Sequence, residues 1–158
     1  MKYTTPEIWR SVNVRDKNAR EAAFQNWDSA FKRYFDYLEE IKPKISNRIW
    51  KTILNCHKLH DTTIRSISIE NHWKRQKRYM VCKISLGEEE CEEQILLLKN
   101  LTGFQMSIMN NDALPGGVFL WGYSEFELLS DGKMKMSLLC DVCNEYEFIF
   151  ESMKLIKI

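Results

Sequence analysis

The sequence lacks any apolar run that could cross a membrane, because a spanning helix needs roughly 20 such residues. Its first residues, Met1-Lys2-Tyr3, lead into a polar segment and not into the apolar core of a signal peptide. The five cysteines are an odd number, which without a secretion signal indicates reduced thiols and not a disulfide framework. Together these absences predict a cytoplasmic protein that makes no membrane contact.

The sequence also lacks the patterns that would identify a cofactor site. Gly116-Gly117 is not part of the Gly-x-x-x-x-Gly-Lys pattern of a phosphate loop, and no helix start follows it. There is no internal repeat, low-complexity tract or linker, so the 158 residues fit one domain, 1–158. We therefore expect a single domain without a cofactor and without a catalytic constellation.

Helical patterns fill residues 1–60. Thr5 precedes a proline at a first helical position, which predicts a short helix near 5–12. From Asp16 to Ile41 apolar residues recur every three or four positions, which indicates one long amphipathic helix. The same spacing predicts a third helix over Ile45–His57.

Residues 61–158 change to the alternation of β-strands. Strands are expected over 62–69, 78–86 and 91–99, and the pair Asp131-Gly132 marks a tight hairpin turn between two later strands. Helices followed by strands predict an α+β fold. In this fold the N-terminal helices pack on one face of a C-terminal antiparallel sheet of about six or seven strands.

Charge is divided between the two parts, although the net charge is only +1. Residues 1–60 hold 12 Lys/Arg and 7 Asp/Glu, a balance of +5, whereas residues 61–158 hold 11 and 15, a balance of −4. This asymmetry either steers a charged partner or reflects two ordinary polar surfaces.

Two charged clusters are candidate binding sites. The basic cluster combines four cations with an indole, which can bind phosphates and stack a base, or can form a solvated turn. The acidic cluster can imitate a nucleic-acid backbone toward a basic partner, or can protect a sheet edge from aggregation. The basic residues are Trp73, Lys74, Arg75, Lys77 and Arg78, in an expected hairpin loop, and the acidic residues are Glu88, Glu89, Glu90, Glu92 and Glu93.

Two further groups could bind a metal. His57, His60 and Asp61 offer two imidazoles three residues apart and a carboxylate, either as metal ligands or as an oriented general base. The alternative is that they close the helix end and anchor the first strand. Cys140 and Cys143 form a Cys-x-x-Cys pair, but the second ligand pair that a zinc site requires is not spaced suitably. We expect ordinary thiols here and no bound metal.

Three segments carry a resemblance to a known kind of protein: Tyr34–Lys42, Leu59-His60-Asp61 and Phe119–Phe126. Their order resembles that of an uncharacterised bacterial family of small cytosolic proteins, which look like immunity proteins of polymorphic toxin systems. The resemblance covers residues 34–158. It implies a cognate toxin as the partner, neutralised by direct protein–protein binding, and it implies no catalytic residues.

The sequence thus predicts a non-catalytic binding protein with a protein partner, bound through the acidic or the basic cluster. Two alternatives stay open. One is a metal-dependent enzyme that uses His57, His60 and Asp61. The other is a nucleic-acid-binding protein that uses the 73–78 segment, although nucleic acid is the less favoured partner.

Overall fold

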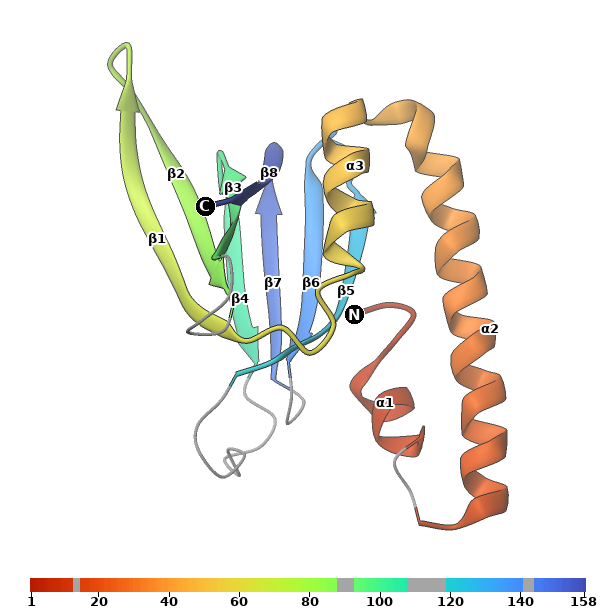
Figure 1. Cartoon of the computed structure of the whole chain (residues 1–158). Helices are drawn as coiled ribbons and strands as arrows, with labels where there is room; N and C mark the ends of the chain where they lie inside the picture. Colours follow the sequence, from red (N-terminus) through yellow and green to blue (C-terminus); the bar gives the residue numbers. More distant parts are fainter. Residues whose placement is uncertain (13–14, 88–92, 108–118, 141–143) are drawn as a thin grey trace.

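A computed structural model describes residues 1–12, 15–87, 93–107, 119–140 and 144–158 of the chain. Helices come first and antiparallel strands follow, so the predicted α+β class is confirmed (Figure 1). The helical elements are α1 (Pro6–Val12), α2 (Lys17–Ile41), the 3-10 turn η1 (Lys42–Lys44) and α3 (Asn47–Cys56). The strands are β1 (Ile64–Lys74), β2 (Lys77–Leu86), β3 (Gln94–Lys99), β4 (Gly103–Ser107), β5 (Trp121–Leu128), β6 (Met134–Cys140), β7 (Glu145–Phe150) and β8 (Ser152–Lys157).

Local signals set the helix bounds where the sequence predicts them. The Asp16 carboxylate accepts a hydrogen bond from the Ala19 N–H at 2.7 Å and caps α2. The Ser46 hydroxyl caps α3 in the same way, through the Ile49 N–H at 3.3 Å. No helix among the described residues is both long and apolar enough to span a bilayer.

The strands form two four-stranded sheets, which differs from the single sheet of six or seven strands that the sequence suggests. The orders are β1-β2-β3-β8 and β4-β7-β6-β5. One kinked antiparallel ribbon belongs to both, because β3 continues into β4 and β7 continues into β8. At the kink Asn100 has a positive φ of 54°, and the Glu151 N–H donates to the Lys99 carbonyl at 3.1 Å. A pattern of alternation alone cannot reveal where a strand leaves one sheet for another.

The kinked ribbon leaves two pairs of edge strands, β8 with β5 and β1 with β4. The helices gather at the first pair, where α3 packs against β8 and α2 runs along β5 (Figure 1). The helices therefore pack on the sheets as the sequence predicts, and they close the side of the fold between β8 and β5. No ladder joins β1 to β4 within the described residues; at the start of β1, Thr63 pairs instead with Leu120, which leads into β5.

Two tyrosines of α2 bind the edge of β5. The Tyr34 hydroxyl accepts a hydrogen bond from the Phe126 N–H, and the Tyr37 hydroxyl accepts one from the Leu128 N–H, both at 2.8 Å. Tyr34 is only 1% exposed, and burial raises the pKa of its phenol well above the usual value. A neutral hydroxyl thus satisfies a backbone donor that would otherwise be buried without a partner.

The chain start is bound to the same strand. The buried Glu125 carboxylate accepts hydrogen bonds from the backbone N–H groups of Lys2, Tyr3 and Thr4, and from the Thr4 hydroxyl at 2.7 Å. Several donors on one carboxylate compensate the desolvation of its charge. The residues before α1 are thereby fixed beside β5.

A bulge in β5 changes the direction of its side chains. Trp121 pairs with Cys140 and Tyr123 pairs with Leu139, so Gly122 is the extra residue on the β5 side. A Cβ atom at Gly122 would lie 2.6 Å from the Leu139 carbonyl oxygen, closer than real contacts. Only glycine permits this approach, and the bulge therefore depends on it.

One hydrophobic core joins all layers. It contains side chains from α2, α3 and both sheets, and its largest fully buried members include Trp121, Tyr34, Phe126, Phe148 and Phe150. The first half of α2 contributes little, because Ala19 and Ala22 are exposed although the sequence pattern includes them in the apolar stripe. The helical part and the β part are consequently one packed unit.

Replacing Tyr34 by phenylalanine removes the acceptor of a buried N–H, which we expect to cost about 1–3 kcal/mol of unfolding free energy. Tyr37→Phe is the matched control, since the half-buried Leu128 N–H can turn to water, and we expect it to cost less than about 1 kcal/mol. Urea denaturation measures both. Equal losses would show that the Tyr34 hydroxyl has no special role.

Replacing Gly122 by alanine places a methyl group against the Leu139 backbone, which we expect to cost about 1–3 kcal/mol. Gly132→Asn is the control, because Gly132 has φ +81° with nothing within 4 Å of a Cβ, and asparagine adopts such angles readily. Thermal unfolding of the two variants should differ clearly, and a Gly122→Ala variant as stable as the parent would mean that the bulge needs no glycine.

Candidate functional site

The β1–β2 hairpin extends beyond the sheet to which it belongs (Figure 1). Strand β2 pairs with β3 only from Val81 onward, whereas its pairing with β1 continues to the contact of Lys74 with Lys77. Residues 71–80 therefore form a two-stranded projection, which we call the arm. The sequence predicts a loop over part of this segment, but the structure forms strand up to the two turn residues Arg75 and Gln76.

The turn of the arm is unusual in its residues. Arg75 has φ 48° and Gln76 has φ 66°, both in the left-handed region that glycine or asparagine normally occupies. Positive φ at two central positions is typical of a type I′ hairpin turn, which matches the twist of the strands. Two long side chains here store backbone strain, which directs attention to the arm as a functional segment.

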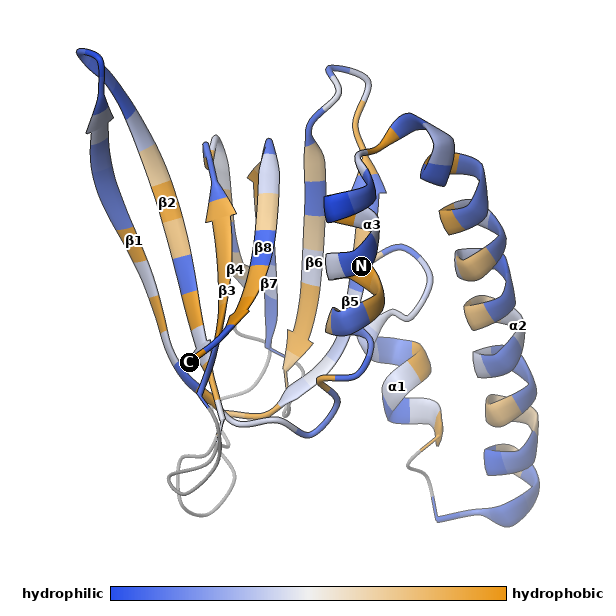
Figure 2. Cartoon of the chain, turned by 45° about the horizontal axis from the view of Figure 1, so that its top comes forward, coloured by the Kyte–Doolittle hydropathy of each residue, from blue (hydrophilic) through white to orange (hydrophobic). Residues whose placement is uncertain are grey.

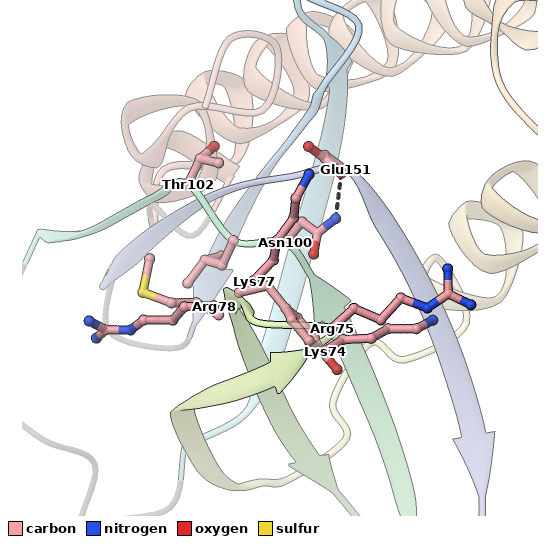
Figure 3. A pocket seen from close by; sticks show the side chains of 10 residues that line it. Lys74, Arg75, Lys77, Arg78, Asn100, Thr102 and Glu151 are labelled. Atoms are coloured by element: carbon pink, nitrogen blue, oxygen red, sulfur yellow. Dashed lines mark hydrogen bonds between the residues drawn. The ribbon is translucent and has the colours of Figure 1, made fainter.

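The basic cluster lies on the arm, in a hydrophilic tip (Figure 2). Trp73 is 71% exposed, the largest exposure among the described large hydrophobic side chains. The cations do not converge: Lys74 and Arg75 extend to one side of the hairpin and Arg78 to the other (Figure 3). Arg78 is also bound, because its Nε donates to the Asn71 side-chain oxygen at 2.8 Å.

A pocket of about 880 Å³ lies between the arm and the kink of the ribbon (Figure 3). The Leu101 N–H donates to the Met80 carbonyl at 3.0 Å and joins the kink to β2. The Asn100 amide donates to the Glu151 carboxylate, which also lines the pocket. The pocket thus has an apolar part, at Met80 and Leu101, beneath a rim of mixed charge.

A second, apolar groove runs beside β1 and has a volume of about 460 Å³. We call it the seam, because it lies between the edge strands β1 and β4. Four of its apolar side chains are unusually exposed for their size: Ile69 is 41% exposed, Phe104 45%, Met106 48% and Phe119 40%. Arg65 and Ser66 also line the seam. The apolar side chains of the seam are Ile64, Ile67, Ile69, Phe104, Met106 and Phe119, beside Tyr146.

The seam and the arm share one strand and one face. Side chains of a strand alternate between its two faces, so Ile67, Ile69 and Trp73 of β1 point to the same side. On β4, Phe104 follows shortly after Thr102, which lines the pocket of the arm. The pocket at the arm and the seam therefore lie next to each other along the same two segments, β1 and the chain that leads into β4.

The acidic cluster is only partly observable. Glu88, Glu89, Glu90 and Glu92 lie outside the described residues. Glu93 precedes β3, and its carbonyl accepts the Ile158 N–H at 2.9 Å. On β1, the Glu70 carboxylate contacts Lys83 at 2.8 Å and His72 at 3.2 Å, and not the cations of the basic cluster. The hydrogen bond from Lys83 lowers the pKa of Glu70.

His57 and His60 both border one small hollow beside β5, but their surroundings differ. His57 ends α3 and points among aromatic rings, with centroid distances of 5.7 Å to Tyr34 and 5.7 Å to Phe35. His60 lies at the surface, where its Nδ1 is 2.7 Å from an Asp61 carboxylate oxygen. Within the described ranges, no three or more His, Cys, Asp and Glu side chains are grouped so that they could hold a metal ion.

The described cysteines, Cys56, Cys82 and Cys140, are buried thiols. Burial raises the pKa of Cys56 and of Cys82 to about 12, so both stay protonated and unreactive at neutral pH. Cys140 ends β6 as a buried thiol, and Cys143 lies outside the described residues. The Cys-x-x-Cys pair therefore has only one member whose surroundings are known.

Sequence reasoning missed the seam. The alternation of Phe104 and Met106 on a predicted strand is visible in the sequence, but it is also typical of an ordinary buried face. Their exposure follows from the position of β4 as an edge strand, which depends on pairing with β7 about forty residues later.

Comparison of this chain with protein-family models, curated proteins and solved structures gives no match. The resemblance to immunity proteins therefore stays a prediction.

Substituting Gln76 by glycine removes side-chain strain at a positive φ, and we expect the free energy of unfolding to rise by about 1 kcal/mol. Gln105→Gly is the control, because Gln105 is an exposed residue within β4 and glycine inside a strand is destabilising. Urea denaturation should give opposite signs for the two variants. A loss of stability in both would contradict a strained turn.

Proposed function

We propose that this chain is a non-catalytic binding protein that takes an extended segment of a partner protein into the seam, with the arm beside it. The observation that supports this is the group of exposed apolar side chains between two edge strands. Single exposed apolar residues are ordinary, but a group of them in one groove is typical of a protein-interaction site.

The backbone of the seam favours an extended ligand. An edge strand presents unpaired N–H and C=O groups to which a further strand can bind. Beyond the bridge at Thr63, no strand within the described residues pairs with the outer edge of β1, and none pairs with that of β4. An inserted strand would gain backbone hydrogen bonds there, while Phe104 and Met106 would contact its alternate side chains.

The positive charge of the arm favours a partner segment that carries acidic residues next to its apolar part. Lys74, Arg75 and Lys77 lie at the end of β1 and β2 beyond the seam. Such cations accelerate encounter with an acidic partner and fix its direction in the groove. The expected ligand is therefore an alternating apolar strand flanked at one end by Asp or Glu.

Nucleic acid fits less well. Phosphates are bound by cations that converge on one path, whereas the side chains of the arm diverge. The apolar side chains of the seam would remain without a function in a nucleic-acid complex.

An immunity-type role is the form of this function that the sequence resemblance implies. An immunity protein acts by occupying a surface of its cognate toxin, so it needs no catalytic residues. The seam and the arm would be the surface that binds the toxin, and the toxin would supply the acidic extended segment.

The test uses fluorescein-labelled peptides with alternating valine and threonine followed by four aspartates or, in a matched peptide, four lysines. Fluorescence anisotropy should detect binding of the aspartate peptide and its weakening by salt. Met106→Asp should weaken binding about tenfold or more, because it places a charge in the seam. Phe24→Asp is the control, since Phe24 is equally exposed but lies on α2.

Charge reversal separates the contribution of the arm. Arg75→Glu should lower the affinity and the salt dependence for the aspartate peptide, whereas Lys51→Glu on α3 should change neither. Equal binding of the lysine peptide would refute the charge assignment. Tight binding of a single-stranded oligonucleotide at low salt, without binding of either peptide, would favour the nucleic-acid alternative instead.

A further inference from the structure

A small cavity lies at the opposite side of the fold, where α2 and the end of α3 meet the β5 bulge. Its volume is about 170 Å³. Aromatic rings form most of its walls, among them Phe31, Tyr34, Trp121 and Tyr123. The exposed Phe35 and His60 also line it and leave it partly open to solvent.

Two buried polar atoms in this wall have no hydrogen-bond partner. They are the Ser124 hydroxyl oxygen and the His57 Nε2. Ser124 is only 7% exposed, so bulk water does not satisfy its hydroxyl. Buried polar groups are nearly always hydrogen-bonded, and two unsatisfied groups on one cavity indicate a partner that occupies it.

The bulge at Gly122 is part of this arrangement. Gly122 itself lines the cavity, between Trp121 and Tyr123. Bulges redirect side chains and are frequent beside binding sites. Here the bulge allows the ring of Tyr123 to contact His60, at a centroid distance of 4.7 Å, next to the hydroxyl of Ser124.

None of the described residues that line the cavity is Asp, Glu, Lys or Arg. Burial lowers the pKa of His57, and burial together with the nearby Asp61 raises the pKa of Tyr123, so neither is charged at neutral pH. The Cys56 thiol, with its pKa raised to about 12 by burial, is not a nucleophile either. The site is thus suited to binding and not to covalent chemistry.

Size and polarity define the ligand class. An apolar cavity of about 150 Å³ accommodates one benzene molecule, so this cavity holds a single ring. The aromatic walls favour a planar ring, and the two unpartnered atoms offer one donor and one acceptor. We propose that this cavity binds a neutral, planar, one-ring nitrogen heterocycle with an N–H and a C=O on one edge, held by Ser124 and His57.

Uracil is a suitable probe, because it is neutral at pH 7 and carries adjacent N–H and C=O groups. Titration followed by ¹⁵N NMR should shift the amide signals of Trp121, Gly122, Tyr123 and Ser124, and leave those of the arm unchanged. Benzene has the ring without the polar edge and should bind about a hundredfold more weakly, as expected for the loss of two hydrogen bonds. Tetramethylammonium, a cation that aromatic walls can also bind, should not bind.

Two variants test the polar atoms. Ser124→Ala and His57→Phe should each weaken uracil binding about tenfold while benzene binding is kept. Ser124→Ala should also leave the melting temperature unchanged or raise it, because the removed hydroxyl has no partner in the free protein. Ser66→Ala, at an exposed position of β1, is the control and should alter neither.

The proposal fails if uracil produces no shifts up to its solubility limit, which would mean that the cavity holds only water. It also fails if benzene binds as tightly as uracil, or if tetramethylammonium binds in preference to both. These comparisons use the unmodified protein and do not depend on whether a variant folds. They are also independent of the seam, which lies on other strands.

Discussion

The backbone groups at the sheet edges constrain this structure more than any other feature. An edge strand whose N–H groups are removed from water must find other acceptors. On β5 these acceptors are the hydroxyl oxygens of Tyr34 and Tyr37, supplied by one helix at a spacing of three residues. The position of α2, the entry of the chain through Glu125 and the core around Phe126 all follow from this contact.

The edge strands β1 and β4 have no such covering helix within the described residues. Between β1 and β4 the same architecture exposes Ile69, Phe104 and Met106 in a groove and continues β1 into a charged arm. One side of the fold is thus closed by helices and stable, whereas the other presents backbone and apolar side chains together. The two sides differ in structure although one ribbon serves both sheets and supplies one edge strand to each side, β8 beside β5 and β4 beside β1.

Signals that act over a few residues predicted the structure well. The start of α2 near Asp16, its end at Ile41 and the Asp131-Gly132 turn depend only on neighbouring residues, and these predictions are confirmed. The kink at Asn100, the division into two sheets and the exposure of Phe104 depend on partners distant in sequence, which no local pattern contains. The cavity beside Ser124 belongs to the same class, since a β bulge and two helices must meet to form it.

The shared ribbon also has a consequence for how the chain reaches its native state. Strand β3 forms its second ladder with β8, so Lys99 has to meet Ser152 before the first sheet is complete. Closing such a long loop costs chain entropy before the new contacts can compensate that cost. Proteins dominated by pairings between distant residues therefore fold slowly. Because neither sheet can be completed without the ribbon, the two should form and melt in one cooperative transition. During synthesis on the ribosome, β1, β2 and β3 would remain without β8 until the end of the chain is made, and their apolar faces would be accessible to chaperones.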